Sequence, residues 1–172
     1  MKNPQQVFIG LGSNLGDGQN NLLAAWQRLG EVAGITLNRL SSPYRTKPVD
    51  LNTDHWFTNA VGEILATLSP TELLAVMLAI ETKLGRDRTL TQDRPVDLDL
   101  LYYGDLIMDS PTLTVPHPRI AHRLFVLAPL AEVAPAQVHP ILGRTSLELC
   151  RALGTQAGVE RQEWRNKGPF GV

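Results

Sequence analysis

The chain has 172 residues, of which 43% are hydrophobic and 19% are charged, and its formal net charge is −1. Such a composition is typical of one soluble globular domain, and the near-neutral charge excludes a protein that attracts nucleic acid or an anionic membrane through its overall field. The single cysteine, Cys150, excludes an internal disulfide and a cysteine-rich zinc site. Because residues 1–6 are polar and no long apolar run follows them, we expect a cytoplasmic protein without a signal peptide or a membrane span.

The first half of the chain alternates between strand and helix patterns. Apolar residues over 22–29 recur at helical spacing, and Asp17 is a suitable N-cap for that helix. The segment 49–54 is polar and turn-rich, so we interpret it as a loop that could close over a ligand. The predicted elements are a buried strand entering a glycine-rich turn over 6–17, a helix over 20–29, and strands over 35–45 and 57–66.

The second half opens with a clear helix start. Ser69 is an N-cap, Pro70 occupies the first helical position and Glu72 completes a capping box, so a helix should run to Gly85. The charged loop over 86–93 is a second candidate for closing over a ligand. The further predicted elements are a strand over 94–101, extended segments over 106–108 and 113–119, and helices over 120–133 and 146–153.

The order of these elements through residue 103 is β-α-β-β-α-β. This order predicts an α+β fold of the ferredoxin-like kind, in which an antiparallel sheet has helices on one face and C-terminal additions follow. We predict a single domain over 1–153 and a tail over 154–172 that either frays or lies over the sheet. The other face of the sheet should carry polar side chains.

Two aspartates stand at strand spacing in the sequence RPVDLDLL. Asp97 and Asp99 are two residues apart, so a strand presents both carboxylates on one face, where they could bind a divalent cation or a pair of cations. Arg86, Arg88 and Arg94 are close in sequence and could hold anionic oxygens. The pattern indicates phosphoryl transfer, although an antiparallel strand with an ordinary solvated acidic face shows the same alternation.

Six motifs, in order, resemble those of the 6-hydroxymethyl-7,8-dihydropterin pyrophosphokinase family over about residues 6 to 153. They are GLGSNLG over 10–16, SSPYRT over 41–46, FTNA over 57–60, Ile80-Glu81 with Gly85-Arg86, RPVDLD over 94–99, and VPHPR over 115–119 with RLF over 123–125. The resemblance implies transfer of the β,γ-diphosphate of ATP to the hydroxymethyl group of a reduced pterin, with release of AMP, in folate biosynthesis.

The same resemblance implies a role for each matching residue. Asp97 and Asp99 would bind two Mg²⁺ ions that bridge the triphosphate, and Arg86 and Arg94 would steady the charge on the transferring group. The residues implied in ATP binding are His117, Arg123, Arg86 and Arg94. The residues implied in pterin binding are the ring-stacking Phe57 and Phe125, the hydrogen-bonding Asn59, and the pocket-lining Thr46 and Pro48.

Three features depart from the family pattern. The loop over 86–94 is shorter than in the best-known members and lacks their tryptophan. Asp93 precedes Arg94 where many members have Gly-Pro, which adds a negative charge near the phosphates. Pro118 follows His117 where an aromatic residue is frequent, which affects the expected contact with adenosine.

Other interpretations are compatible with the residues alone. His117, between two prolines, suits a surface or capping histidine, and Phe57 and Phe125 suit core packing. For the whole protein, the two acids also allow a two-metal phosphodiesterase or nuclease, and the fold allows a module that binds RNA or a small ligand. We expect a monomer that binds ATP and the pterin, with no nucleic-acid or membrane partner.

Overall fold

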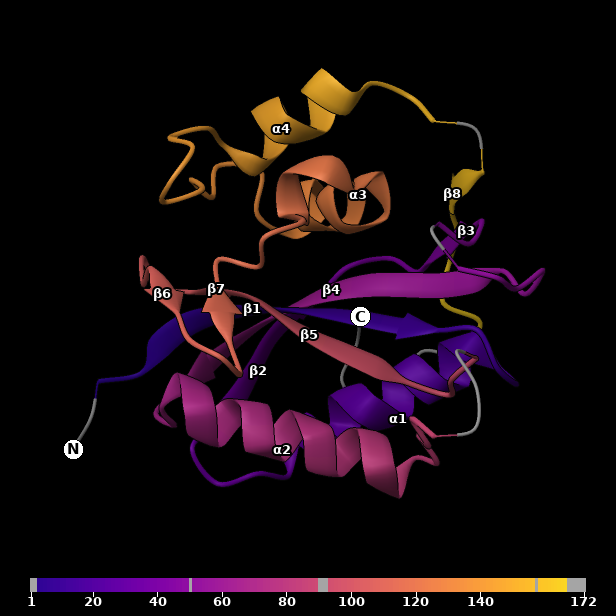
Figure 1. Ribbon diagram of the computed structural model, residues 1–172, viewed down its shortest axis with the longest axis horizontal. Coiled ribbons are helices and arrows are strands. Elements are labelled where there is room, and N and C mark those ends of the chain that lie inside the picture. Colours follow the sequence, from indigo (N-terminus) through magenta and orange to yellow (C-terminus); the bar gives the residue numbers. More distant parts are fainter. Residues whose placement is uncertain (1–2, 50, 90–92, 157, 167–172) are drawn as a thin grey trace.

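The computed structural model describes residues 3–49, 51–89, 93–156 and 158–166, and it contains a six-stranded antiparallel sheet (Figure 1). The strands of this sheet are β1 (Gln5–Ser13), β2 (Ile35–Leu40), β3 (Tyr44–Thr46), β4 (Phe57–Ala66), β5 (Asp97–Tyr103) and β8 (Val159–Arg161). The remaining elements are α1 (Gly18–Gly30), α2 (Pro70–Lys83), β6 (Met108–Asp109), β7 (Thr114–Val115), the 3-10 helix η1 (Ile120–His122), α3 (Leu124–Val133) and α4 (Ser146–Leu153). Parts of both predicted loops, Asp50 and residues 90–92, lie outside the described residues.

Strand β1 lies between β4 and β5 in the order β5-β1-β4-β3-β8, and β2 also pairs with β4. The register of β1 with β5 places Gly10 beside Asp99 and Gly12 beside Asp97. Directly opposed residues of an antiparallel pair point to the same face, and glycine has no side chain. Strand β1 therefore leaves space next to both aspartates.

Helices α1 and α2 cover one face of the sheet, and α3 and α4 lie on the other (Figure 1). The prediction that helices cover one face holds for α1 and α2, but α3 and α4 cover the other face, which was not predicted. The second face is apolar at one end, where Phe8, Leu101 and Tyr102 pack against Leu127 and Leu130 of α3. Burial of these large side chains stabilises the contact with α3, because it removes apolar area from water. The polar end of the same face carries the aspartates.

Two predicted elements are interrupted. The predicted strand over 35–45 is divided into β2 and β3, because Pro43 has no N–H to offer the ladder and the chain bends between the two strands. Both pieces pair antiparallel with β4, which agrees with the predicted antiparallel sheet. The predicted helix over 120–133 is divided at Arg123, whose backbone is extended, with φ −123° and ψ 101°.

The predicted strand over 94–101 begins only at Asp97. The peptide groups of Arg94 bond instead to Asn14, which follows β1: Asn14 N–H donates to the Arg94 carbonyl at 3.1 Å, and Arg94 N–H donates to Asn14 Oδ1 at 2.8 Å. Pro95 then follows without a donor of its own. The hydrogen-bonded pairing of β5 with β1 therefore begins only at Asp97.

The predicted helix starts are confirmed. Asp17 caps α1 by accepting from Asn20 N–H, and Ser69 and Glu72 form a reciprocal capping box at the start of α2. Gly85 follows α2 with φ +94°, a conformation that favours glycine. Among the described helices, no segment is long and apolar enough to cross a membrane.

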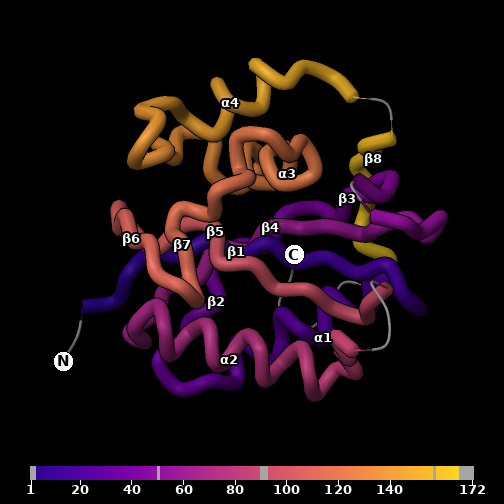
Figure 2. Tube along the Cα trace, viewed as in Figure 1, coloured from indigo at the N-terminus to yellow at the C-terminus, as the bar shows by residue number. Residues whose placement is uncertain are grey.

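The described part of the C-terminal segment extends the sheet. Strand β8 pairs antiparallel with β3, and Figure 2 shows it next to that strand. Farther along, Trp164 Nε1 donates to the Ser41 carbonyl at 2.9 Å, and the Arg165 guanidinium lies 2.6 Å from Asp17. In residues 158–166, the chain therefore adds an edge strand to the sheet and then contacts Ser41 and Asp17.

Candidate active site

Asp97 and Asp99 project from β5 to the same face of the sheet. Leu98, between them, points into the opposite core and is 5% exposed. Both aspartates line a cleft between the sheet and α3, and the Asp97 side chain is 22% exposed. The strand therefore does not present an ordinary solvated acidic face.

Most of the predicted site residues meet at this cleft. Those that line it are Thr46, Phe57, Asn59, Arg94, Asp97, Asp99, Arg123 and Phe125. Pro48, Arg86 and His117 are not among its lining residues. Lys47 and Arg119 also line the cleft but were not predicted as site residues. In the sequence, Lys47 directly follows the motif SSPYRT, and Arg119 is the last residue of the motif VPHPR.

The cleft has two aromatic rings and an amide on its walls. The guanidinium carbon of Arg94 lies 5.0 Å from the centre of the Phe57 ring, and that of Arg123 lies 5.5 Å from the centre of the Phe125 ring. Asn59 Nδ2 donates to Thr46 Oγ1 at 2.7 Å. These contacts combine flat apolar surfaces with fixed polar groups, as sites for flat heterocycles do.

Arg94 is held between the glycine turn and β5. Its guanidinium lies 3.1 Å from Asp97, while its backbone bonds to Asn14 on both sides. Asn14 Nδ2 also donates to Asp93 at 2.7 Å, and His55 Nδ1 lies 2.8 Å from the same carboxylate. Asn14 was not predicted as a site residue, although it lies within the quoted GLGSNLG motif.

Arg86 lies on the other side of Asp97, outside the cleft lining. Its Nη1 is 3.5 Å from the carboxylate, and its side chain is 12% exposed. Burial lowers the pKa of the Arg86 guanidinium, and the charge of Asp97 opposes that change. Its Nε has no hydrogen-bond partner among the described residues. An arginine with an unused donor is suited to bind anionic oxygen.

Glu81 connects α2 to the strand that carries the aspartates. It is 1% exposed, accepts from Leu98 N–H at 2.7 Å and lies 2.6 Å from the guanidinium of Arg88. Burial raises the pKa of Glu81, and the bond from Leu98 opposes the rise. Glu81 thereby anchors the backbone between Asp97 and Asp99.

The two aspartates form a donor set for a cation. Burial, followed by the charge of Asp97, raises the pKa of Asp99 to about 6, and Arg123 opposes this rise. Burial and the charge of Asp97 thus destabilise the ionised form of Asp99 more than the nearby arginines stabilise it. Among the described residues, no group of three or more acidic, histidine or cysteine side chains gathers to hold a metal. Two carboxylates nevertheless suit Mg²⁺, which accepts one or two protein carboxylates and takes phosphate oxygens and water as its other ligands.

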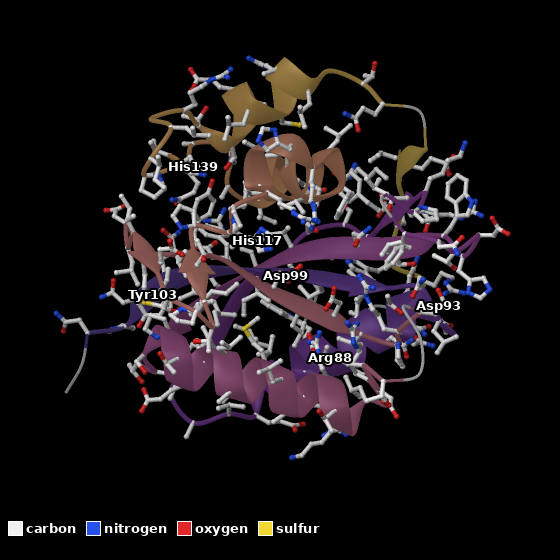
Figure 3. The ribbon with its side chains drawn as sticks, viewed as in Figure 1. Arg88, Asp93, Asp99, Tyr103, His117 and His139 are labelled. Carbon is white, nitrogen blue, oxygen red and sulfur yellow. The ribbon has the colours of Figure 1, made fainter. Side chains whose placement is uncertain are left out.

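A second cavity begins on the far side of Asp99. It is lined by Leu74 of α2, by Asp99 and by the segment 110–114 with His117. Figure 3 shows Asp99 and His117 near the middle of the molecule. His117 Nδ1 accepts from Arg119 N–H at 3.2 Å, and burial, together with the charges of Arg123 and Arg119, lowers the pKa of its imidazole. Asp99 thus lies where the two cavities meet.

An antiparallel sheet that presents paired carboxylates and arginines between two cavities defines an α+β enzyme of the phosphate-transfer class. Residues 8–135 match the family described as 7,8-dihydro-6-hydroxymethylpterin-pyrophosphokinase (HPPK). The chain belongs to this family. The predicted class of enzyme, a pyrophosphokinase of folate biosynthesis, is thereby confirmed.

Similar proteins agree with this assignment. A 2-amino-4-hydroxy-6-hydroxymethyldihydropteridine pyrophosphokinase of Synechocystis is 43% identical over 85% of this chain and 76% of its own length. One of Methylorubrum extorquens is 39% identical over 92% of this chain and 99% of its own length. A crystal structure of Plasmodium falciparum HPPK-DHPS superposes with a TM-score of 0.76 over 94% of this chain, which spans about half (49%) of that chain. At 14% identity, the last likeness shows the fold alone.

Proposed function

We propose that this chain transfers the β,γ-diphosphate of ATP to the hydroxymethyl oxygen of 6-hydroxymethyl-7,8-dihydropterin and releases AMP. In this reaction the hydroxymethyl oxygen bonds to the β-phosphorus, the bond from that phosphorus to the oxygen of the α-phosphate breaks, and the hydroxyl proton is released. The observation that carries the proposal is that Asp99 lines both cavities. One cavity then receives the pterin and the other receives ATP, with the carboxylates where the substrates meet.

The cleft is assigned to the pterin. Phe57 and Phe125 supply apolar faces for the ring, and Asn59 and Thr46 supply polar atoms at its edge. Asn59 uses its amide N–H on Thr46, so its oxygen remains to accept from a ring N–H. Pro48 belongs to the same segment as Thr46, and we place it at the margin of the site.

The second cavity and the arginines are assigned to ATP. His117 lines that cavity, and Arg123 reaches the cleft from the residue just before α3. Arg86 and Arg94 flank Asp97 and would steady the negative charge that spreads over the transferring group. Their positions are fixed before the substrates arrive, which lowers the cost of reorganisation during the reaction.

Asp97 and Asp99 would hold two Mg²⁺ ions. When bound, these ions would neutralise the triphosphate and make the hydroxyl proton easier to remove, so that no strong general base is needed. The protein supplies the ionised carboxylates and keeps them on one face, while Glu81 fixes the backbone between them.

The remaining expectations complete the proposal. The strand order β5-β1-β4-β3, with β2 also on β4 and with α1 and α2 on one face, supports a ferredoxin-like arrangement extended by α3, α4 and β8. We also propose that the protein is a monomer and acts in the cytoplasm. We propose no nucleic-acid or membrane partner, and the net charge of −1 supports this last point.

The direct test is incubation of the purified chain with ATP, Mg²⁺ and the reduced hydroxymethylpterin, with separation of the nucleotides and pterins over time. We expect equal amounts of AMP and pterin diphosphate. Formation of ADP, release of inorganic phosphate, or cleavage of a nucleic acid in place of AMP formation would reject the proposal. Omission of Mg²⁺, or omission of the pterin, is the control and should leave ATP intact.

A further inference from the structure

One carboxylate outside the cleft joins three separate segments of the fold. Glu132, near the end of α3, accepts hydrogen bonds from the N–H and Oγ of Ser42, both at 2.9 Å, and from the hydroxyl of Tyr44 at 2.8 Å. Arg161 of β8 lies 3.4 Å from the same carboxylate and donates to Ser42 Oγ at 3.1 Å. The hydrogen bonds lower the pKa of Glu132 although its partial burial opposes this. Glu132 is therefore ionised at neutral pH, and its two oxygens accept hydrogen bonds from Ser42 and Tyr44.

The position of this cluster relates it to the cleft. Glu132 and Phe125 are seven residues apart on α3, which is about two turns, so they lie on the same side of the helix. Tyr44 and Thr46 are two residues apart on β3 and are both buried, so they lie on the same face of the strand. Glu132 and Tyr44 thus join the helix to the strand, and Phe125 and Thr46 of the same two elements line the cleft.

Among the residues that the structure describes, few other polar contacts connect α3 with β3 and set their separation. Pro129, inside α3, cannot donate a hydrogen bond to the Phe125 carbonyl, so one backbone bond of the helix is missing between Phe125 and Glu132. Arg39 also anchors the helix, by donating to the Val133 carbonyl at 3.1 Å, but it does so from β2. The hydrogen bond from Tyr44, by contrast, links α3 to β3, the strand whose Thr46 lines the cleft.

We propose that Glu132 is a positioning residue that sets the distance between α3 and β3, and with it the width of the cleft for the pterin ring. This inference rests on the function proposed above. The second cavity is lined by β5, α2 and the segment before η1, and it shares neither α3 nor β3. Arg123, which is assigned to ATP, also precedes α3, so loss of Glu132 should weaken use of the pterin more than use of ATP and not leave ATP wholly unaffected.

The experiment compares Michaelis constants for the two substrates in the full chain. Glu132→Ala should raise the KM for the pterin by about tenfold, since it removes several hydrogen bonds to a charged group. The KM for ATP should stay within about twofold of the wild type. Tyr44→Phe, which deletes only the hydroxyl, should raise the KM for the pterin by a smaller factor in the same direction.

Conservative and control variants separate positioning from general stability. Glu132→Gln keeps the shape and can still accept from Ser42 and donate to Tyr44, so it should restore most of the affinity for the pterin. Arg161→Ala should have little effect, because the Arg161 side chain is 57% exposed and exposed ion pairs contribute little. Glu160→Gln, on the exposed side of β8, is the matched control and should match the wild type.

The outcomes distinguish this inference from the proposed function. If the wild type forms no AMP, the proposed function fails and the inference falls with it. If the wild type is active but Glu132→Ala and Tyr44→Phe lower only the thermal midpoint and leave both Michaelis constants unchanged, Glu132 has only a structural role. An equal rise in both constants would also overturn the inference, because the cleft would not be the part affected.

Discussion

Glu81 of α2 accepts a hydrogen bond at 2.7 Å from the backbone N–H of Leu98, the residue between the two aspartates. Because Glu81 is 1% exposed, its removal leaves a donor without an acceptor inside the protein. We predict that Glu81→Ala lowers the free energy of unfolding by about 1–3 kcal/mol and also lowers kcat. Denaturant unfolding and steady-state assays measure the two effects. Lys83→Ala, at an exposed position of the same helix, should change neither.

Asp97 is expected to be essential for turnover and dispensable for folding. Its side chain is partly exposed and lies between two arginines, so it contributes little to the core. Asp97→Asn should lower kcat by about a thousandfold or more, since the charged ligand proposed for the substrate-bound cation is lost. The thermal midpoint should change by only a few degrees, as measured by circular dichroism. Activity like that of the wild type would remove Asp97 from the proposed site.

Arg94 is expected to act mainly in the transition state. Its guanidinium is already placed beside Asp97 and over the Phe57 ring. Arg94→Ala should therefore lower kcat by about a hundredfold while the Kd for ATP, measured by calorimetry, rises by a smaller factor. Equal losses in kcat and in ATP affinity would instead indicate ordinary ground-state binding. Arg45→Ala, with its guanidinium over the Trp56 ring, is a comparison outside the cleft lining.

The pKa of Asp99 predicts how stability depends on pH. It is raised from 3.8 to about 6, so between these values the folded state holds a proton that the unfolded state has released. The contribution of Asp99 is therefore fully present below about pH 4 and is lost as pH rises to about 6. Relative to the Asp99→Asn variant, the free energy of unfolding of the wild type should fall by on the order of 2 kcal/mol as the pH rises across this range.

Magnesium should change this profile. A cation that binds the ionised carboxylate stabilises the folded state once Asp99 has released its proton. Urea unfolding at several pH values, with and without Mg²⁺, should show the stability of the wild type recovering near pH 6 only when Mg²⁺ is present. Asp99→Asn should lack that recovery. A wild-type profile that Mg²⁺ leaves unchanged would argue against a metal at Asp99.

Gly62 of β4 is expected to tolerate no larger side chain. A Cβ at this position would overlap the ring of Trp26 from α1. Gly62→Ala should lower the free energy of unfolding by about 1–3 kcal/mol, because the ring or the helix has to shift. Gly10→Ala, on the adjacent strand β1, is the matched comparison, since the nearest side-chain atom to its Cβ would be at an ordinary 3.5 Å. Equal melting temperatures for the two variants would contradict the packing argument.

Local patterns in the sequence identified much of the fold. The capping residues Asp17 and Ser69 mark the helix starts correctly, because a cap is a contact between neighbours in the chain. The same holds for the side on which Asp97 and Asp99 project, which follows from strand periodicity alone. The later start of β5 was missed, since it depends on bonds to Asn14, which is 80 residues away in the sequence. The interruption at Arg123 was also missed, although the backbone bonds around it are local.

What the sequence by itself determined is the position of most of the main helices and strands, the face shared by the two aspartates and the family to which the chain belongs, because each depends on local spacing or on short motifs. Only the tertiary structure decided that α3 and α4 cover the second face, that Asp99 lies between two cavities, and that Glu81, Asn14 and Glu132 hold the site from outside it. These relationships join residues that lie 17 to 90 positions apart. The physical reason is that such bonds form only when the packing of the whole sheet brings their partners together, and no local pattern specifies that packing.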